Sequence, residues 1–291
     1  MNLICTLLRR LLRMATVVLL VVIGSIVLVR FAPGYLSDAR EMDARYADGA
    51  RNELAAEAAR SASVGGMLWS EVRGLLRRDL GVSRQYEVPV VELVRPRLAV
   101  TVGLLLKSML LAWLIAGCTA TISNWGRSPV SLPGRLCHLT STLLLAVPIG
   151  AMATVCLLAD SGGPLLVLTT LLAARDFKFL DRMLRKAWND PHLLHARAQG
   201  VPTPELIRVH LLPGIMPQLG SLATLSILTA LGAMVPVEVI FSTPGIGQLA
   251  WNAAMNRDLP VLLAVTVMMA IAVTASGFGT GSRRATEWQS A

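Results

Sequence analysis

Cysteine and histidine are the side chains best suited to metal or nucleophilic chemistry, but their spacing in this sequence favours neither. The sequence holds Cys5, Cys118, Cys137, Cys156, His138, His192, His195 and His210. No CxxC or CxxH spacing occurs, and we expect the cysteines to be small core residues rather than ligands or disulfide partners. The histidines all fall at or beyond the inner edge of the predicted membrane region, where interface or surface roles are expected. We predict no metal site.

Catalytic motifs are also absent from the sequence. There is no Walker phosphate loop, no HExxH, no GxSxG and no pair of intramembrane aspartates. An ATPase, a metalloprotease or an intramembrane hydrolase would therefore lack its chemistry here. We predict that the chain is not an enzyme and holds no cofactor, so that any energy for its work comes from another chain.

A segment punctuated by glycine and proline carries the first informative motif. It contains His195, Ala196, Arg197, Ala198, Gln199 and Gly200, followed by His210, Leu211, Leu212, Pro213 and Gly214. Gly200 is suited to the left-handed conformation that ends a helix, and Pro204 to the first turn of the next helix. The pattern predicts a short helix near 194–200 exposed to the cytosol. An ordinary amphipathic connector between two spans is the alternative.

The second motif begins at Glu238 and ends at Pro260. It contains Glu238, Val239, Ile240, Phe241, Ser242, Thr243, Pro244, Gly245, Ile246 and Gly247, then Arg257, Asp258, Leu259 and Pro260. An irregular backbone at membrane depth is tolerated only under a cover of protein or beside water. Glu238 needs a partner at that depth, either the amides of the loop or Arg257. It lies near the external end of a translocation path, or it only stabilises the loop.

Both motifs resemble those of the permeases of ABC importers. In these proteins an Ala-rich helix and a glycine precede an Ile/Leu-x-Leu-Pro element. The second motif is similar to the signature of the dipeptide/oligopeptide/nickel family, in which Glu, Val-Phe-Ser, Pro-Gly-x-Gly and Arg-Asp-x-Pro follow in this order. Further matches to the B-type permease are Ala32, Pro33, Gly34, Arg78, Asp79, Leu80, Gly81, Val82, Ser83, Pro89, Val90, Leu98, Thr101 and Leu104.

The resemblance implies a six-span, all-α, MetI-like type I importer permease. It also implies particular partner proteins and particular functional residues. Its expected partners are a second permease, ABC ATPase subunits that bind ATP and Mg, and an extracytoplasmic solute-binding protein. The residues implied in coupling to the ATPase are Leu194, His195, Ala196, Arg197, Ala198, Gln199, Gly200 and Pro213. Those implied in the translocation path or outer gate are Glu238, Phe241, Pro244, Gly245, Gly247, Arg257 and Asp258.

Two departures from the family pattern stand out. The family usually begins its first motif with Glu-Ala-Ala, whereas this chain has His195, Ala196 and Arg197. The outer segment between the third and fourth predicted spans, 158–163, is also shorter than in relatives. A glutamate-dependent docking contact is therefore not expected in the same form, and access for the solute is expected to differ.

Lys107 is the only charged residue inside its predicted span. Because a charge facing lipid is costly, Lys107 should face the bundle, a cavity or a partner subunit, where it contacts an anionic solute. The alternative is snorkelling to the interface or a structural pair with a carboxylate. We include Lys107 among the translocation-path candidates.

Composition places these motifs in a lipid bilayer. Of the residues, 54% are hydrophobic and 15% charged, and mean hydropathy is +0.60. Apolar runs of the length that spans a bilayer cover 14–29, 98–122, 139–158, 219–237 and 259–278. The run 163–174 is too short alone, but the helical period of the charged stretch after it predicts one long helix that continues into the cytoplasm. Six spans result.

The charges fix an orientation for these spans. With Arg9, Arg10 and Arg13 inside, the inner segments carry 14 Lys/Arg against 5 Asp/Glu, while the two short outer loops carry one against three. This follows the positive-inside rule and puts both termini in the cytoplasm. The basic balance thus reflects topology, and no nucleic acid partner is predicted. Only Lys107, Lys178 and Lys186 are lysines, a bias that indicates a GC-rich genome and a bacterial source. We therefore expect the chain in a bacterial plasma (inner) membrane.

The predicted organisation has four parts. Residues 1–30 form the cytoplasmic amino terminus and first span, which we expect to be retained rather than cleaved as a signal peptide. Residues 31–97 form an extracytoplasmic domain, 98–278 the permease core with the coupling segment 190–213, and 279–291 a cytoplasmic tail. We predict a permease for dipeptides or oligopeptides, with nickel or another small solute as one alternative and a non-transporting membrane scaffold as another.

Overall fold

The computed structural model describes residues 80–83, 85–125, 132–256 and 258–276, with single residues and short pieces between 8 and 24. Arg257, most of the predicted first span, the predicted outer domain up to residue 79 and the tail 279–291 lie outside the described residues. Within the described ranges the chain is helical, and only an isolated bridge between Val82 and Pro89 has β character. The all-helical membrane class predicted from the sequence is confirmed.

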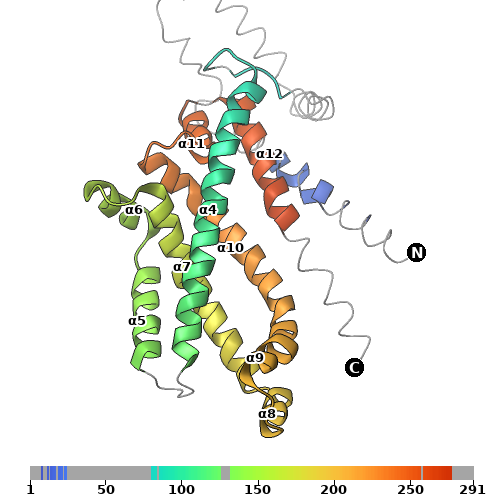
Figure 1. The fold of residues 1–291 in the computed structure, drawn as a ribbon. Coiled ribbons are helices and arrows are strands. Elements are labelled where there is room, and N and C mark those ends of the chain that lie inside the picture. Colours follow the sequence, from blue (N-terminus) through green and yellow to red (C-terminus); the bar gives the residue numbers. More distant parts are fainter. Residues whose placement is uncertain are drawn as a thin grey trace, which may run out of the picture. The chain divides into compact units, whose positions relative to one another are not determined.

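The helices follow one another with short connections (Figure 1). Their bounds are α4 (Val90–Trp125), α5 (Leu132–Ala146), α6 (Ile149–Leu158), α7 (Gly163–Trp188), α8 (Pro191–Ala198), α9 (Thr203–Glu205), the π-helix η2 (Leu206–Leu211), α10 (Leu212–Ile240), α11 (Ile246–Met255) and α12 (Leu259–Ser276). The chain divides into two compact units, Met1–Pro96 with Leu249–Thr274 and Arg97–Gln248 with Ala275–Ala291.

Small residues let α4 pack closely in the second unit. The buried positions Ser108, Ala112, Ala116 and Ala120 recur every four residues and line one face of α4. Ala116 and Ala120 pack against Phe177 of α7 and its neighbours, and Ala112 packs against Leu172, Ala173 and Ala230. Small side chains bring helix backbones close together, which is how helices associate where lipid removes the hydrophobic driving force.

The cysteine prediction is wrong for Cys118, which is exposed on α4. Residue 118 lies between the buried positions 116 and 120, and a half-turn of helix directs it away from the small-residue face. Cys137 and Cys156 are half-buried, and all three are free thiols.

The predicted span 139–158 is not one straight helix, which corrects the sequence analysis. It falls on α5 and α6, and these two helices meet at a 94° bend after Ala146. Pro148 precedes α6 in an extended conformation, with φ −58° and ψ 136°. A residue before proline avoids the helical region and proline lacks an N–H, so the helix ends at this point although the apolar run continues.

The long helix predicted from the short run 163–174 is present as α7. It has 26 residues, and Gly162, with φ +78°, starts it in the left-handed conformation. Phe177, Leu180 and Met183 bury their side chains in the same cluster as α4, so the charged half of α7 remains packed along an apolar stripe. The helical period of the sequence was sufficient to find this element.

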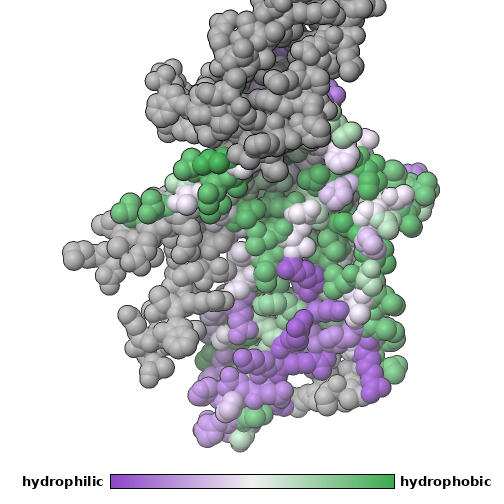
Figure 2. Space-filling model, turned by 180° about the vertical axis from the view of Figure 1, so that it is seen from behind, coloured by the Kyte–Doolittle hydropathy of each residue, from purple (hydrophilic) through white to green (hydrophobic). Residues whose placement is uncertain are grey.

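Three helical segments of the described residues are long and apolar enough to cross a membrane. They are Val90–Asn124, Leu206–Ile240 and Leu259–Ser276, and the bent pair of α5 and α6 is a fourth if counted as one span. On the face in Figure 2, hydrophilic side chains gather toward the end that carries α8, and hydrophobic ones cover much of the remaining surface. The count of six spans stays a prediction.

Candidate functional site

The first motif forms a short helix whose ends are set by local chemistry. Asp190 caps α8 by accepting a hydrogen bond from the backbone N–H of His192 at 3.2 Å, and Pro191 occupies the first turn. Gly200 follows the helix with φ +81°, as predicted for a left-handed stop. The helix covers Pro191–Ala198 rather than 194–200, because the Asp-Pro start lies upstream of the motif.

One side of α8 is held against the ends of the neighbouring helices. Leu193 and Ala196 are buried in a cluster with Leu206 and Leu211 of η2. Leu184, Ala187, Trp188 and Val201 pack around this cluster. The cluster therefore joins α8 to the end of α7 and to the π-helix that continues into α10.

Arg197 adds a cation–π contact on the same side of α8. Its guanidinium lies 5.9 Å from the ring centre of Trp188, the last residue of α7, which is cation–π range. α8 is thus joined to the end of α7 by contacts of two kinds, apolar packing and this stacking.

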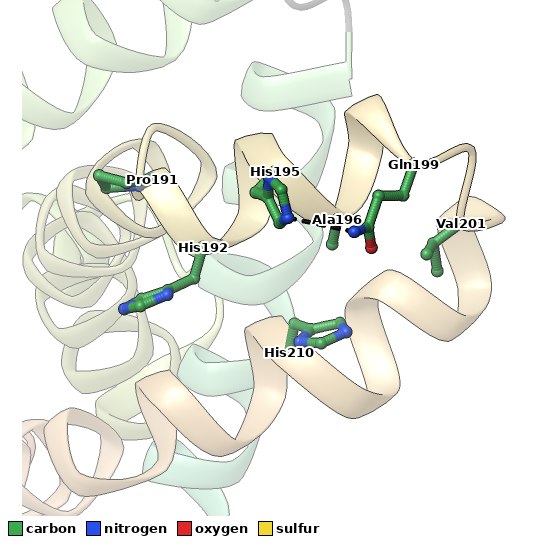
Figure 3. Close-up of a pocket in the computed structure, with 7 residues that line it drawn as sticks. All are labelled: Pro191, His192, His195, Ala196, Gln199, Val201 and His210. Atoms are coloured by element: carbon green, nitrogen blue, oxygen red, sulfur yellow. Dashed lines mark hydrogen bonds between the residues drawn. The ribbon is translucent and has the colours of Figure 1, made fainter.

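The opposite side of α8 is exposed. His192, Leu194, His195, Ala198 and Gln199 all face outward, and the Leu194 side chain is 49% exposed. The side chains of His195 and Gln199 are hydrogen-bonded to each other, with their Nε2 atoms 3.1 Å apart (Figure 3). Pro213 lies in the first turn of α10 and is also exposed. Of the predicted coupling residues, only Ala196 is buried, and Arg197 is half-buried. The structure therefore brings most of the predicted coupling residues together on one accessible surface.

Glu238 lies completely buried near the end of α10. Its carboxylate accepts hydrogen bonds from Thr101 Oγ1 at 2.7 Å, from the N–H of Gly247 at 2.7 Å and from the N–H of Gln248 at 3.2 Å. These amides belong to the first turn of α11, whose N–H groups have no partner within the helix. The carboxylate accepts hydrogen bonds from these N–H groups, and its negative charge is stabilised by the positive end of the helix dipole.

The glycines of this motif allow a close approach to Glu238 and to the backbone of α10. A Cβ at Gly245 would overlap the Glu238 carboxylate, and a Cβ at Gly247 would come within 2.8 Å of Val235 Cα. The loop between α10 and α11 is also bound to the backbone of Glu238, because the Thr243 N–H donates a hydrogen bond to the main-chain oxygen of Glu238 at 2.9 Å. Gly245 is therefore explained by the close approach of the loop to Glu238, and Gly247 by the close approach of α11 to the α10 backbone at Val235 and to the Glu238 carboxylate.

Of the two partners expected for Glu238, backbone amides or Arg257, the structure shows backbone amides, and they belong to the first turn of α11. Phe241 packs against the cluster of α6, α7 and α10 that includes Val167 and Met234, and Pro244 lies in the irregular segment just before α11. The second expected partner, Arg257, lies outside the described residues. Sequence reasoning did not single out Thr101 as a site residue, although it counted it among the residues that resemble the B-type permease.

Asp258 organises a turn in the first unit. Its carboxylate accepts from Ser83 Oγ and, at 3.3 Å, from the N–H of Gln85, while Ser83 Oγ accepts from the Tyr86 N–H at 3.0 Å. Asp258 is 1% exposed. The Asp-Leu-Pro element thus binds the Gly-Val-Ser element that precedes α4, two matches to the family that are far apart in the sequence.

Lys107 lies on the outward side of α4. Its side chain is exposed, together with Leu106, Leu110 and Leu114. Of the three environments expected for Lys107, the structure does not show the bundle of its own chain, because the buried face of α4 is formed by small residues. A cavity or a partner subunit remains the expected environment.

Asp181 forms a buried polar network that sequence reasoning missed. Its carboxylate accepts from His138 Nε2 and Arg185 Nε, each at 2.7 Å, and from Asn124 Nδ2 at 2.9 Å. Burial opposes the charge, but hydrogen bonds from Arg185, His138 and Ser123 outweigh it and hold the pKa of Asp181 below its usual value. This carboxylate lies in the half of α7 predicted to extend beyond the membrane, and it joins α4, α5 and α7.

A second buried carboxylate, Asp176, joins helices of the same bundle. Asp176 is completely buried and accepts from Ser226 Oγ at 2.8 Å, and Trp113 Nε1 donates to Ser226 Oγ at 3.3 Å. The sequence placed Asp176 at the start of a charged stretch, without a sign of its burial. In the part of the chain that the structure describes, no group of three His, Cys, Asp or Glu side chains lies close enough to hold a metal ion.

Comparison with known proteins identifies the family. Residues 100–280 match the model of the binding-protein-dependent transport system inner membrane component. This match covers most of the chain, including α5 to α12, and the chain belongs to this family. It is therefore a multi-pass membrane protein of the class found as the inner membrane component of ABC importers.

Individual relatives agree with this assignment. The chain is 32% identical over 108 residues to the metal-staphylopine import system permease protein CntB of Staphylococcus aureus, covering 37% of this chain and 34% of CntB. It is 39% identical over 75 residues to the oligopeptide transport system permease protein OppB of Escherichia coli, covering 25% and 24%. It is 29% identical over 227 residues to the oligopeptide transport system permease protein AppB of Bacillus subtilis, covering 68% and 71%.

The extent of these matches differs between relatives. The chain spans about a third of the length of CntB and about a quarter of OppB, but 71% of AppB. All three are permease proteins, which are membrane transport components rather than enzymes.

Proposed function

We propose that this chain is the permease subunit of an ATP-driven importer for dipeptides or oligopeptides. It forms the translocation path with a second permease and couples that path to ABC ATPase subunits. An extracytoplasmic solute-binding protein delivers the solute. ATP and Mg are bound by the ATPase subunits, so the chain itself changes no covalent bond.

The observation that best supports this proposal is the way in which α8 packs against its neighbouring helices. Its outward side is exposed, while Leu193 and Ala196 fix its inward side to η2 and to the end of α7. These elements continue into α7 and α10, so a force applied to α8 moves long helices rather than a free loop. This is the mechanical property required of a coupling helix, in which closure of the ATPases becomes a rearrangement of the spans.

The second motif supports the proposal in a different way. The bonds of Glu238 fix an irregular backbone between two helices, which makes the loop a rigid element. We assign Phe241, Pro244, Gly245 and Gly247 to the outer end of the path, where this loop bounds it. Glu238 acts there by holding the loop and does not contact the solute, because it is completely buried. Arg257, Asp258 and Lys107 complete the proposed set.

The proposal includes an orientation. We propose that α8 and both termini lie in the cytoplasm and the loop after α10 on the outer side, which the positive-inside distribution of charges supports. This arrangement puts the exposed surface of α8 where ATPase subunits are found. The solute-binding protein then meets the opposite end.

A second solute class is favoured by one specific observation. CntB is named as a metal-staphylopine permease, and its identity to this chain is 32% over 108 residues. Import of a metal complex, or of nickel, is therefore the second candidate. The permease role is the same for both solutes.

The test is uptake into proteoliposomes that contain this chain, the second permease and the ATPase, with the solute-binding protein added outside. We expect accumulation of a labelled peptide that requires both this chain and ATP. If a metal complex is accumulated instead of the peptide, the second solute class is assigned. Absence of ATP-dependent accumulation for either class would contradict a transport role.

A non-transporting scaffold is the competing interpretation, and co-purification separates it from a permease. A permease is expected to retain an ABC ATPase subunit stoichiometrically when purified in mild detergent. A scaffold would purify without one.

A further inference from the structure

The buried carboxylates of the second unit differ in how many hydrogen bonds reach them. Among its described residues these carboxylates are Asp176, Asp181 and Glu238. Asp181 and Glu238 each accept at least three hydrogen bonds. Asp176 is completely buried, yet its one hydrogen-bond donor within the described ranges is the hydroxyl of Ser226, and its Oδ1 atom has no partner there. Asp176 therefore lacks the donors that stabilise the negative charge of the other two.

The hydroxyl of Ser226 is itself shared. Its oxygen lies 2.8 Å from Asp176 Oδ2 and 2.9 Å from the main-chain oxygen of Leu222, and Trp113 Nε1 donates to it at 3.3 Å. A hydroxyl group has one hydrogen to donate. The Ser226 hydrogen can therefore satisfy either Asp176 or Leu222 in full. An ionised Asp176 would have at most one full hydrogen bond for its two oxygens.

The surroundings of Asp176 are apolar. Leu172, one helical turn before Asp176 on α7, and Ala230, one turn after Ser226 on α10, belong to the same buried apolar cluster. An ionised carboxylate in such surroundings is strongly destabilised unless a paired charge or several hydrogen bonds compensate it. The compensation must therefore come from a nearby cation, or the carboxyl group must be neutral.

The cations closest to Asp176 along α7 do not provide this compensation. Arg175 donates a hydrogen bond to the main-chain oxygen of Leu225 at 3.0 Å, and Lys178 lies two residues after Asp176, half-buried. Of the ion pairs among the described residues, those of this bundle belong to Asp181 and none includes Asp176. The Asp181 network uses its own donors further along the helix.

The helices packed against α7 bring no compensating charge either. α10 has no ionisable side chain between Leu212 and Val237. The ionisable side chains of α4 between 98 and 123, of α5 and of α6 are exposed or belong to other clusters. They are Lys107, Cys118, Arg135, Cys137, His138 and Cys156. A neutral carboxyl group is the alternative that this arrangement leaves.

We propose that Asp176 is a proton-binding site whose neutral carboxyl acts as a pH-sensitive lock between α7 and α10. A neutral carboxyl can donate from Oδ2 to Ser226 Oγ, which leaves the Ser226 hydrogen for Leu222. The second oxygen then lacks a partner without carrying charge, which costs less than an unpaired charge. Loss of the proton would put an uncompensated charge between the two helices, so a rise in pH weakens their contact. The inference depends on neither the solute nor the transport role.

Asp176→Asn tests the proton, because an amide has nearly the shape of the neutral acid and no charge. The folded wild type holds a proton that the unfolded chain releases above a carboxyl pKa of about 4, so wild type loses stability as the pH rises. We expect the Tm of Asp176→Asn in detergent to exceed that of wild type by roughly 2 °C or more at neutral pH. The difference should shrink as the pH is lowered.

Asp181→Asn is the matched control, because it is the same substitution on the same helix at a carboxylate that has at least three donors. It should lower the Tm at neutral pH, which is the opposite sign. A lower Tm for Asp176→Asn at neutral pH, or failure of this variant to fold, would overturn the neutral Asp176.

Infrared difference spectroscopy reads the protonation state directly. The spectrum of wild type minus that of Asp176→Asn at neutral pH should contain the C=O band of a protonated carboxylic acid. If the bands of an ionised carboxylate are found in its place, the proposal is overturned whatever the Tm values are.

Discussion

Thr101 Oγ1 donates a hydrogen bond to Glu238 Oε1 at 2.7 Å and accepts one from the N–H of Ile246 at 2.8 Å. The hydroxyl therefore connects α4, the end of α10 and the start of α11 at a single buried point. Glu238 occupies the other side of the same turn through its bonds to Gly247 and Gln248. The irregular segment between α10 and α11 is fixed by two side chains from helices far apart in the sequence.

Thr101→Val tests the hydroxyl with almost no change of shape. The substitution leaves the Ile246 N–H and one Glu238 oxygen without a partner, which should lower the free energy of unfolding by about 1–3 kcal/mol. The measurement is the Tm of the purified protein in detergent. Thr101→Ser retains the hydroxyl and should melt close to wild type. Equal Tm values for the Val and Ser variants would contradict the role of this bond.

Glu238→Gln tests the carboxylate itself. One carboxylate oxygen accepts from Thr101 Oγ1 and the other from two backbone N–H groups, whereas an amide has a single acceptor oxygen, so the hydrogen bonds on one of the two sides are lost or reversed. We expect a lower Tm and loss of uptake, because the loop no longer holds its conformation. Gln248→Ala is the control, since Gln248 contributes its backbone N–H to Glu238. An uptake-competent Glu238→Gln variant with the wild-type Tm would show that the carboxylate is not needed to hold the loop.

Gly245→Ala should have a similar effect for a steric reason. The added Cβ would overlap the Glu238 carboxylate and force either the loop or the side chain to move. Gly232→Ala is a matched control on α10, because its Cβ meets nothing within 4 Å. Comparison of Tm and expression level separates the two variants. The account is wrong on this point if Gly245→Ala is tolerated as well as Gly232→Ala.

The elements of the fold differ in how well the sequence predicts them. The helix α7 was predicted because an apolar stripe continues through its charged half. The bend between α5 and α6 was missed, because an apolar run carries no signal of direction and the single Pro148 was not weighed. Gly200 was placed correctly, since a left-handed helix stop depends only on local conformation.

Buried charges were the hardest features to predict. Asp181 stands in a stretch with Lys178, Arg182 and Arg185 that has the pattern of a solvated face, yet Asp181 is 1% exposed. Its partner Arg185, four residues later on α7, was a local signal. The contributions of His138 and Asn124 come from other helices, and their positions depend on tertiary packing that no local pattern contains.

Asp181 also predicts a dependence of stability on pH. Because its pKa is lower in the folded protein, its contribution is fully present above the usual aspartate pKa of about 4 and is lost as the pH falls below it. The difference in Tm between wild type and Asp181→Asn should therefore be large at neutral pH and shrink in acid. A difference that does not change with pH would contradict an ionised Asp181 in the folded state.

The coupling role of α8 leads to the final prediction. Gly200 has φ +81°, and its N–H donates to the Arg197 oxygen at 3.0 Å. Proline fixes φ near −65° and has no N–H, so Gly200→Pro changes the end of α8 while the buried cluster of Leu193 and Ala196 remains. Gly214→Ala is the control, because its Cβ meets nothing within 4 Å.

The most direct measurement is ATP-dependent uptake of labelled solute into proteoliposomes, recorded together with ATP hydrolysis, for wild type and Gly200→Pro. The account predicts that Gly200→Pro lowers uptake at least about tenfold, relative to wild type and Gly214→Ala, while the ATPase still hydrolyses ATP. Uptake by Gly200→Pro equal to wild type would contradict the assignment of α8 as the element that couples the ATPase to the membrane helices.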